Sequence, residues 1–252
     1  MDSTVGGLFP GTLFVIGAEH GIGKSGVVLS ALLETPDVAG GIFLEDGPDL
    51  VGGRALAYYA GVNSREFRFA NRLAPGEVKQ VVAAKERLSE MEDIHLEFAL
   101  GGSIEEIEES VGVLGEKGCR IIYLDYLQKV RGVSENRRSE IGLVMQRFQK
   151  ACLAANAVPV LATQLKRRLS TKENPEPRYA EPRLSDFKES GDIEAESRCA
   201  LLLWPDVNEV TIYARLAKSS FGGEGGRANY VRQSCGSLKP VLVATNEWGE
   251  VA

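Results

Sequence analysis

The sequence predicts a single α/β domain over residues 1–252, with a mostly parallel central sheet, helices on both faces and a C-terminal antiparallel extension. Three observations predict this fold. Short runs that are apolar throughout alternate with longer amphipathic segments, a pattern typical of a parallel sheet covered on both faces. A glycine-rich turn joins the first apolar run to the first helical segment. The glycine-rich residues 222–226 separate two further strand-like runs near the C-terminal end.

The elements follow from these patterns in chain order. The predicted strands cover residues 12–16, 41–44, 94–98, 120–124, 158–163, 198–204 and 210–217. The predicted helices cover residues 24–33, 50–60, 75–91, 104–114 and 138–155. Residues 210–251 have the alternation of antiparallel strands, whereas 169–185 are rich in Pro, Glu, Arg and Lys and are expected to be irregular.

Composition excludes several classes of protein. No apolar run approaches the roughly 20 residues that a membrane span needs. The N-terminus carries Asp2 and has no basic region before an apolar stretch, so a secretory signal is not expected. The four cysteines are scattered without a Cys-x-x-Cys pair, which supports neither a zinc site nor a disulfide framework. We therefore expect a cytoplasmic protein without membrane contact. The net charge of −6 does not exclude a local patch of basic residues that binds nucleic acid.

The turn after the first strand has the pattern of a phosphate-binding loop that ends in Gly-Lys-Ser. Its backbone N–H groups and the following helix N-terminus would bind phosphates. Lys24 would reach the β- and γ-phosphates, and the Ser25 hydroxyl would ligate Mg²⁺. A turn that binds nothing is the alternative. The usual first glycine of the pattern is Ala18 here, with Gly17 just before it. The loop comprises Ala18, Glu19, His20, Gly21, Ile22, Gly23, Lys24 and Ser25.

Three polar residues stand at strand ends, where ligand sites of open parallel sheets form. Asp125 ends an apolar strand and would hold Mg²⁺ through water, although a strand-end cap has the same pattern. Glu45 ends another strand and is placed to polarise an attacking water. Gln164 ends a third, where its amide would sense a γ-phosphate.

In this order, the motifs resemble the RecA-like motor domain of DnaB-type replicative helicases over nearly the whole chain. The discriminating segments are Asp-Tyr-Leu-Gln at 125–128 and Glu-Ser-Gly-Asp-Ile-Glu at 189–194. The resemblance also includes Arg54, in the helix after Glu45, which it assigns to the nucleotide site. Generic recombinases or kinases have no reason to carry both discriminating segments.

The resemblance implies ATP and Mg²⁺ as cofactors. Lys24 would bind ATP, with Ser25 and Asp125 at the metal. Glu45 would be the catalytic base, and Gln164 would couple nucleotide state to DNA-facing loops.

The resemblance also implies binding to single-stranded DNA. Lys188, Glu189 and Gly191 would grip its backbone inside a homo-hexameric ring, because a lysine and exposed N–H groups bind phosphate without reading bases. The preceding segment has a local basic excess that is either a solvated loop or a DNA contact. Its basic residues are Lys166, Arg167, Arg168, Lys172, Arg178 and Arg183.

The sequence departs from the family pattern at two places. A lysine and an arginine two residues later would reach a neighbour's ATP site, but here Lys218 is followed by Ser220. Arg227 or Arg215 would substitute, and our hypothesis is that Lys218 works with Arg227. The first strand also begins close to Met1, so we expect neither an N-terminal primase-binding domain nor a linker helix. A primase or loader is an expected partner.

Three functions are compatible with these residues. The leading hypothesis is an ATP-hydrolysing DNA helicase motor. The second is a nucleotide-gated DNA-binding or assembly module with slow hydrolysis and no translocation. The third is a recombinase-like or clock-type ATPase of the same fold, which leaves residues 189–191 unexplained. A small-molecule kinase is disfavoured, because the sequence has no evident acceptor site or basic lid.

Overall fold

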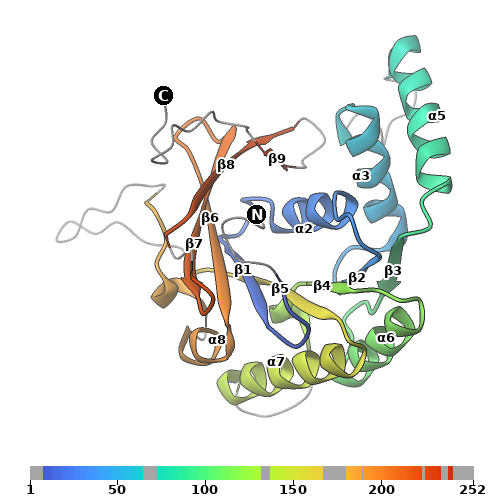
Figure 1. The fold of residues 1–252 in the computed structure, drawn as a ribbon. Helices are drawn as coiled ribbons and strands as arrows, with labels where there is room; N and C mark the ends of the chain where they lie inside the picture. The colour runs from blue at the N-terminus through green and yellow to red at the C-terminus, as the bar shows by residue number, and fades with distance from the viewer. Residues whose placement is uncertain are drawn as a thin grey trace.

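The computed structural model describes residues 8–64, 73–131, 137–166, 180–188, 190–222, 225–233 and 238–240. Within these residues, nine strands form one sheet in the order β3-β2-β4-β5-β1-β6-β7-β8-β9 (Figure 1). The strands from β3 to β6 in this order run parallel. Strands β7, β8 and β9 continue the sheet antiparallel. The predicted fold class, including its antiparallel extension, is confirmed.

The elements agree closely with the predicted ones. The strands are β1 (Phe14–Ala18), β2 (Ala39–Phe43), β3 (Ile94–Phe98), β4 (Ile121–Asp125), β5 (Val158–Gln164), β6 (Cys199–Pro205), β7 (Thr211–Ser219), β8 (Arg227–Arg232) and β9 (Leu238–Pro240). The helices are α2 (Lys24–Leu33), α3 (Pro48–Ala60), α5 (Pro75–Ser89), α6 (Ile104–Glu116), α7 (Arg137–Ala154) and α8 (Ser190–Glu196), with short 3-10 turns η2 (Leu127–Lys129) and η3 (Leu184–Asp186). Helix α8 was not predicted, because one so short leaves no periodic pattern. Among the described residues, no helix combines the length and apolar character that a bilayer span requires.

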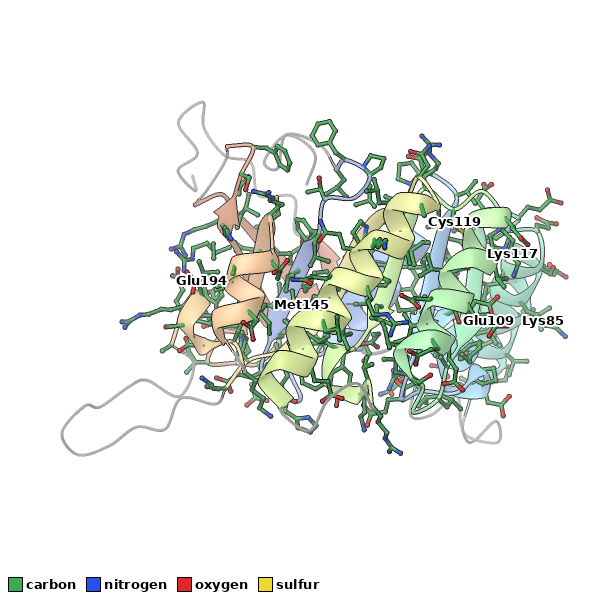
Figure 2. All side chains as sticks on the ribbon, turned by 90° about the horizontal axis from the view of Figure 1, so that it is seen from below. Lys85, Glu109, Lys117, Cys119, Met145 and Glu194 are labelled. Atoms are coloured by element: carbon green, nitrogen blue, oxygen red, sulfur yellow. The ribbon has the colours of Figure 1, made fainter. Side chains whose placement is uncertain are left out.

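The sheet separates two layers of helices. Helices α2, α3 and α5 lie on one face, and α6, α7 and α8 lie on the other (Figure 1). Side chains of β1 alternate between the two faces, as Phe14 and Ile16 pack into the core under α2 while Val15 packs into the core under α7. Figure 2 shows the second face, where α7 crosses between α6 and α8 and Met145 lies near its middle. Met145 is fully buried.

The end of β1 is tightly packed. A Cβ atom on Gly17 would lie 2.6 Å from Cε1 of Phe187 and 3.0 Å from Cδ2 of Leu202. These distances leave no room for a side chain. Gly17 and Ala18 pair with β5 and β6, so the strand extends two residues beyond its predicted end and the glycine-rich loop begins directly after Ala18.

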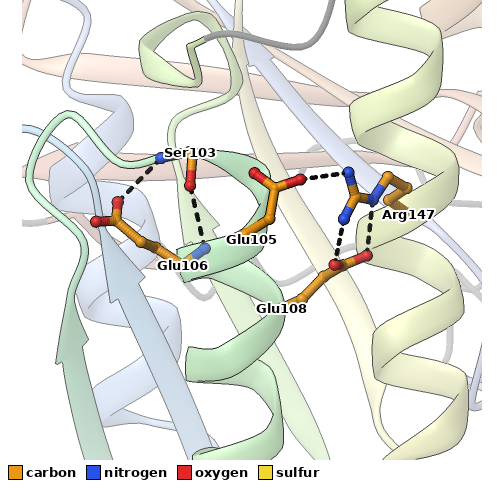
Figure 3. A network of polar contacts seen from close by, with 5 residues as sticks. All are labelled: Ser103, Glu105, Glu106, Glu108 and Arg147. Atoms are coloured by element: carbon orange, nitrogen blue, oxygen red, sulfur yellow. Dashed lines mark hydrogen bonds and ion pairs between the residues drawn. The ribbon is translucent and has the colours of Figure 1, made fainter.

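A polar network fixes α6 against α7 on the second face (Figure 3). Ser103 caps α6, since its hydroxyl accepts from the N–H of Glu106 and its own N–H donates to that glutamate. Arg147 of α7 donates two hydrogen bonds to Glu108, of 2.9 and 2.5 Å, and a third of 2.7 Å to Glu105. The network holds α6 and α7 together on this face of the sheet.

Candidate active site

The loop between β1 and α2 has the backbone that phosphate binding requires. Gly21 and Gly23 have φ angles of +82° and +104°, a left-handed backbone conformation that residues other than glycine rarely adopt. Gly23 is the N-cap of α2. Because glycine has no side chain, it does not cap the first N–H groups of the helix. Helix N-termini of this kind bind anions through these N–H groups and the helix dipole.

Lys24 starts α2 and lies within the predicted site. Its side chain is largely buried, and this desolvation lowers the pKa of its ammonium group. The carboxylates of Asp125 and Glu45 act in the opposite direction, while the nearby Lys188 lowers the pKa further. The Nζ atom also lies 5.3 Å from the ring centroid of Tyr126. A buried ammonium group among such neighbours is suited to pair with an added anion.

Asp125 brings a carboxylate to the same place from the end of β4. The residue is only 3% exposed, and its Oδ1 atom has no hydrogen-bond partner among the described residues. Burial raises the pKa of this carboxyl group to about 6, an effect that a hydrogen bond from Ser25 and the charge of Lys24 oppose. A hydroxyl oxygen next to an unpartnered carboxylate oxygen is a donor set that Mg²⁺ accepts, with waters and phosphates as its remaining ligands. The residues fit that ion.

Glu45 follows β2 at the same edge of the sheet, about half exposed. Its neighbour Leu44 donates a backbone hydrogen bond of 2.9 Å to the carbonyl of Asp125, which holds the ends of β2 and β4 together. The Glu45 carboxylate pairs with Lys129, with 2.9 Å between Oε1 and Nζ. Arg54, assigned to the nucleotide site by resemblance, forms an ion pair with Asp46.

Gln164 reaches the site from the end of β5, and a second glutamine fixes its position. Gln128 accepts a hydrogen bond of 3.0 Å from the backbone N–H of Gln164 and donates one of 2.7 Å to the hydroxyl of Thr163. Gln128 belongs to the segment at 125–128, where the sequence pattern predicts no role for it. Because a polar residue after a strand is common, sequence alone does not identify this bridge.

A cavity of about 460 Å³ lies beside the loop. Glu19, His20, Gly21 and Ile22 of the loop line one side, and the end of β6, including Trp204, lines another. A row of loop backbone beside an aromatic ring suits a ligand with a phosphate group and a flat apolar part.

Two basic residues complete the cavity wall. Lys188 lies next to Gln164, to whose carbonyl its backbone N–H donates a hydrogen bond of 3.3 Å. Arg232 of β8 donates a hydrogen bond from Nη2 to the carbonyl of Ile22 in the loop, at 2.8 Å. Arg232 is not identifiable from the sequence, because no local motif connects the last antiparallel strands to the loop after β1.

The predicted DNA-binding residues are only partly described. Lys188 lines the cavity beside the loop, and Gly191 is exposed in the first turn of α8. Glu189 lies outside the described residues, as do most basic residues of the preceding segment. Lys166 and Arg183, at the two borders of that segment, are exposed.

The cations proposed to act on a neighbour are all engaged within the chain. Arg215 and Arg227 face each other in the β7–β8 register and share the carboxylate of Glu181, at 2.6 and 2.9 Å. Lys218 donates a hydrogen bond to the backbone carbonyl of Glu194 in α8. The structure thus brings the two candidate arginines together on one counter-ion.

Comparison with known proteins places these motifs in a family. The sequence profile of the DnaB-like helicase C-terminal domain matches residues 1–218. The replicative DNA helicase DnaC of Bacillus subtilis is 26% identical over 215 residues, which are 82% of this chain and 46% of that protein. The replicative DNA helicase DnaB of Rickettsia felis is 38% identical over 87 residues, 33% of this chain and 16% of that protein. This chain therefore matches less than half the length of either relative.

Solved structures share the fold. The ATPase domain of G40P superposes with a TM-score of 0.81 at 21% identity, covering 95% of this chain and 88% of that one. A DnaB-like replicative helicase, whose structure describes its interactions with primase, gives 0.78 at 22% identity and covers 92% and 58%. The RadB recombinase gives 0.56 at 15% identity and covers 95% and 96%. These likenesses confirm a RecA-like fold, and the profile match shows that the chain belongs to the DnaB-like helicase C-terminal domain family.

Proposed function

We propose that this chain is an ATP-hydrolysing motor domain that translocates on single-stranded DNA within a replicative DNA helicase. The observation that carries the proposal is the buried Oδ1 atom of Asp125, which has no partner among the described residues. Ser25 and Lys24 are both close enough to lower the pKa of the same carboxyl group. A buried carboxylate with an unpartnered oxygen next to a phosphate loop is suited to bind a magnesium nucleotide.

The residues divide the chemistry among them. The loop N–H groups and Lys24 would bind the phosphates of ATP, and Ser25 and Asp125 would hold Mg²⁺. Bound Mg²⁺ supplies positive charge next to the phosphate oxygens. Glu45 would accept a proton from the attacking water, and the amide of Gln164 would sense the γ-phosphate.

DNA binding and assembly are part of the same proposal. Lys188, Glu189 and Gly191 would contact the phosphate backbone of single-stranded DNA, and the chain would act as a homo-hexamer. Within that ring, Lys218 and Arg227 would reach a neighbour's nucleotide after Arg227 leaves Glu181. Primase or a loader is the partner we expect, because the structure of one similar helicase describes interactions with primase. Residues 1–252 would form a single domain.

A nucleotide-gated DNA-binding or assembly module is the second candidate. It is favoured by the ion pairs that hold Arg215 and Arg227 on Glu181 and by Ser220 where an arginine was expected. A trans arginine contributes about 10³–10⁵ to phosphoryl transfer, so a protein without one would hydrolyse ATP slowly. Tight ATP binding without DNA unwinding would support this candidate.

The experiment that tests the nucleotide site is steady-state ATP hydrolysis with and without Mg²⁺. We expect hydrolysis to require Mg²⁺ and to fall by about 10²-fold or more in Lys24→Ala, since a cation on the transferring phosphate is lost. Lys117→Ala is the matched control, because this lysine pairs with Glu97 beside β3, away from the site. Hydrolysis that persists in Lys24→Ala at the rate of the control would contradict the proposal.

A further inference from the structure

The ion pair between Glu45 and Lys129 connects the proposed catalytic base to a turn on a different strand. Lys129 ends η2, which follows β4 directly after Asp125 and Tyr126. Buried neighbours fix this turn, since Leu127 and Val130 are almost fully buried. The N–H of Lys129 also donates to the carbonyl of Tyr126 at 3.1 Å. The backbone therefore holds Lys129 in place, and its partly exposed side chain remains free to change partner.

The Glu45 carboxylate is engaged by a side chain of this turn. The Lys129 ammonium lies 2.9 Å from Oε1, and the hydrogen bond to Glu45 is the main cause that raises the pKa of Lys129. Burial raises the pKa of the Tyr126 hydroxyl, and the nearby Glu45 carboxylate raises it further. A carboxylate paired with an ammonium group is not available to orient a water molecule and accept its proton.

A second cation stands close to this pair. Arg131, two residues after Lys129, forms a backbone bridge with Ser103, and its charge lowers the pKa of Lys129. Lys129 thus feels the charge of one carboxylate and of one nearby cation. An incoming phosphate would relieve the repulsion between Lys129 and Arg131 and would compete with Glu45 for the ammonium group.

We propose that Lys129 is a positioning residue that restrains Glu45 in the DNA-free protein, and that a backbone phosphate of single-stranded DNA draws Lys129 away and releases Glu45 for hydrolysis. The inference rests on the proposed function, because it takes Glu45 as the base and single-stranded DNA as the ligand. It adds a specific exchange of ion pairs by which DNA binding at one turn changes the rate of ATP hydrolysis. Phosphate contacts of this kind require no base recognition, so the effect should not depend on DNA sequence.

The test compares Lys129→Met with the unmodified chain. Steady-state turnover is measured at saturating ATP and Mg²⁺, with and without saturating oligo-dT. A partly exposed ion pair contributes at most modestly, so we expect DNA-free kcat to rise by about two- to five-fold in Lys129→Met. The stimulation ratio, kcat with DNA over kcat without, should fall by a similar factor. Lys129→Arg keeps the cation and should have a lower DNA-free kcat than Lys129→Met.

The matched control is Lys117→Met, which removes a lysine of similar exposure from a similar ion pair with Glu97. We expect it to leave both turnover rates unchanged. An unchanged or lower DNA-free kcat in Lys129→Met would overturn the inference, and so would an unchanged stimulation ratio. A circular dichroism melt checks that each variant folds. If hydrolysis instead survives in Lys24→Ala, the proposed function itself fails, which is a different result.

Discussion

The Nη2 atom of Arg232 in β8 lies 2.8 Å from the backbone carbonyl oxygen of Ile22, to which it donates a hydrogen bond. The antiparallel extension is thus attached to the phosphate loop itself. This hydrogen bond fixes the shape of the loop. Because Arg232 also lines the cavity beside Trp204, it can contact a bound nucleotide.

Replacing Arg232 with alanine should weaken nucleotide binding. A hydrogen bond from a charged donor contributes about 1.5–3 kcal/mol, so we expect KM for ATP to rise by about tenfold or more. Arg87→Ala is a suitable control, since Arg87 stacks on Tyr59 away from the cavity. Equal KM values in both variants would show that Arg232 is not needed to shape the loop.

Asp125→Asn should stabilise the nucleotide-free protein at neutral pH. Burial raises the pKa of this carboxyl group from 3.8 to about 6, so the folded state binds the proton more tightly than the unfolded state does. The resulting loss of stability develops as pH rises from about 4 to about 6 and reaches about 3 kcal/mol at most. Asparagine carries no charge and removes that loss.

Thermal melts at pH 7.5 and pH 4.5 measure this difference. The Asn variant should melt several degrees higher at pH 7.5, and the gap should narrow at pH 4.5. Mg²⁺ with ATP should raise the Tm of the unmodified protein more than that of the variant. The exposed Asp37→Asn provides the control. A variant that is less stable at pH 7.5 would mean that the charged form of Asp125 has partners that outweigh its burial.

Lys188→Ala should weaken single-stranded DNA binding and reduce its salt dependence. One phosphate contact contributes about 0.7 to the slope of log K against log salt for single strands, so the slope should fall by roughly that amount. Fluorescence anisotropy at several salt concentrations measures it. Lys188 also lines the cavity, so ATP affinity must be measured in parallel. An unchanged slope together with a raised KM for ATP would assign Lys188 to the nucleotide instead of DNA.

Arg227→Ala tests the cation proposed to act in trans. We expect kcat to fall by about 10³-fold or more if Arg227 serves a neighbouring site, because it would stabilise charge on the transferring phosphate. Arg215→Ala is the matched comparison, as both arginines pair with Glu181. Turnover that is unaffected by Arg227→Ala would exclude Arg227 from this role.

Local pattern was enough to predict most of the helices and strands, and the glycine turn between β1 and α2. The observed helix Lys24–Leu33 has its predicted bounds, because a glycine turn before an apolar helix restricts where the helix can begin. Asp125 was expected near the loop, because parallel strands end at one edge of the sheet. The structure places it there, with its carboxyl group hydrogen-bonded to Ser25.

Pairings between distant side chains were not predictable from the same sequence. Arg232 reaches Ile22 only because the register of β7 and β8 folds the last strands back over the loop. The ion pair between Glu45 and Lys129 depends on how η2 projects after β4, which no periodicity encodes. These contacts depend on tertiary geometry, whereas the sequence pattern reports local burial.

ATP turnover with and without single-stranded DNA, measured on the unmodified chain and on Lys24→Ala, tests the central claim most directly. The account predicts that DNA stimulates turnover in the unmodified chain and that Lys24→Ala shows neither basal nor stimulated hydrolysis. Tight ATP binding with slow turnover that does not respond to DNA would contradict a motor and would favour the nucleotide-gated module.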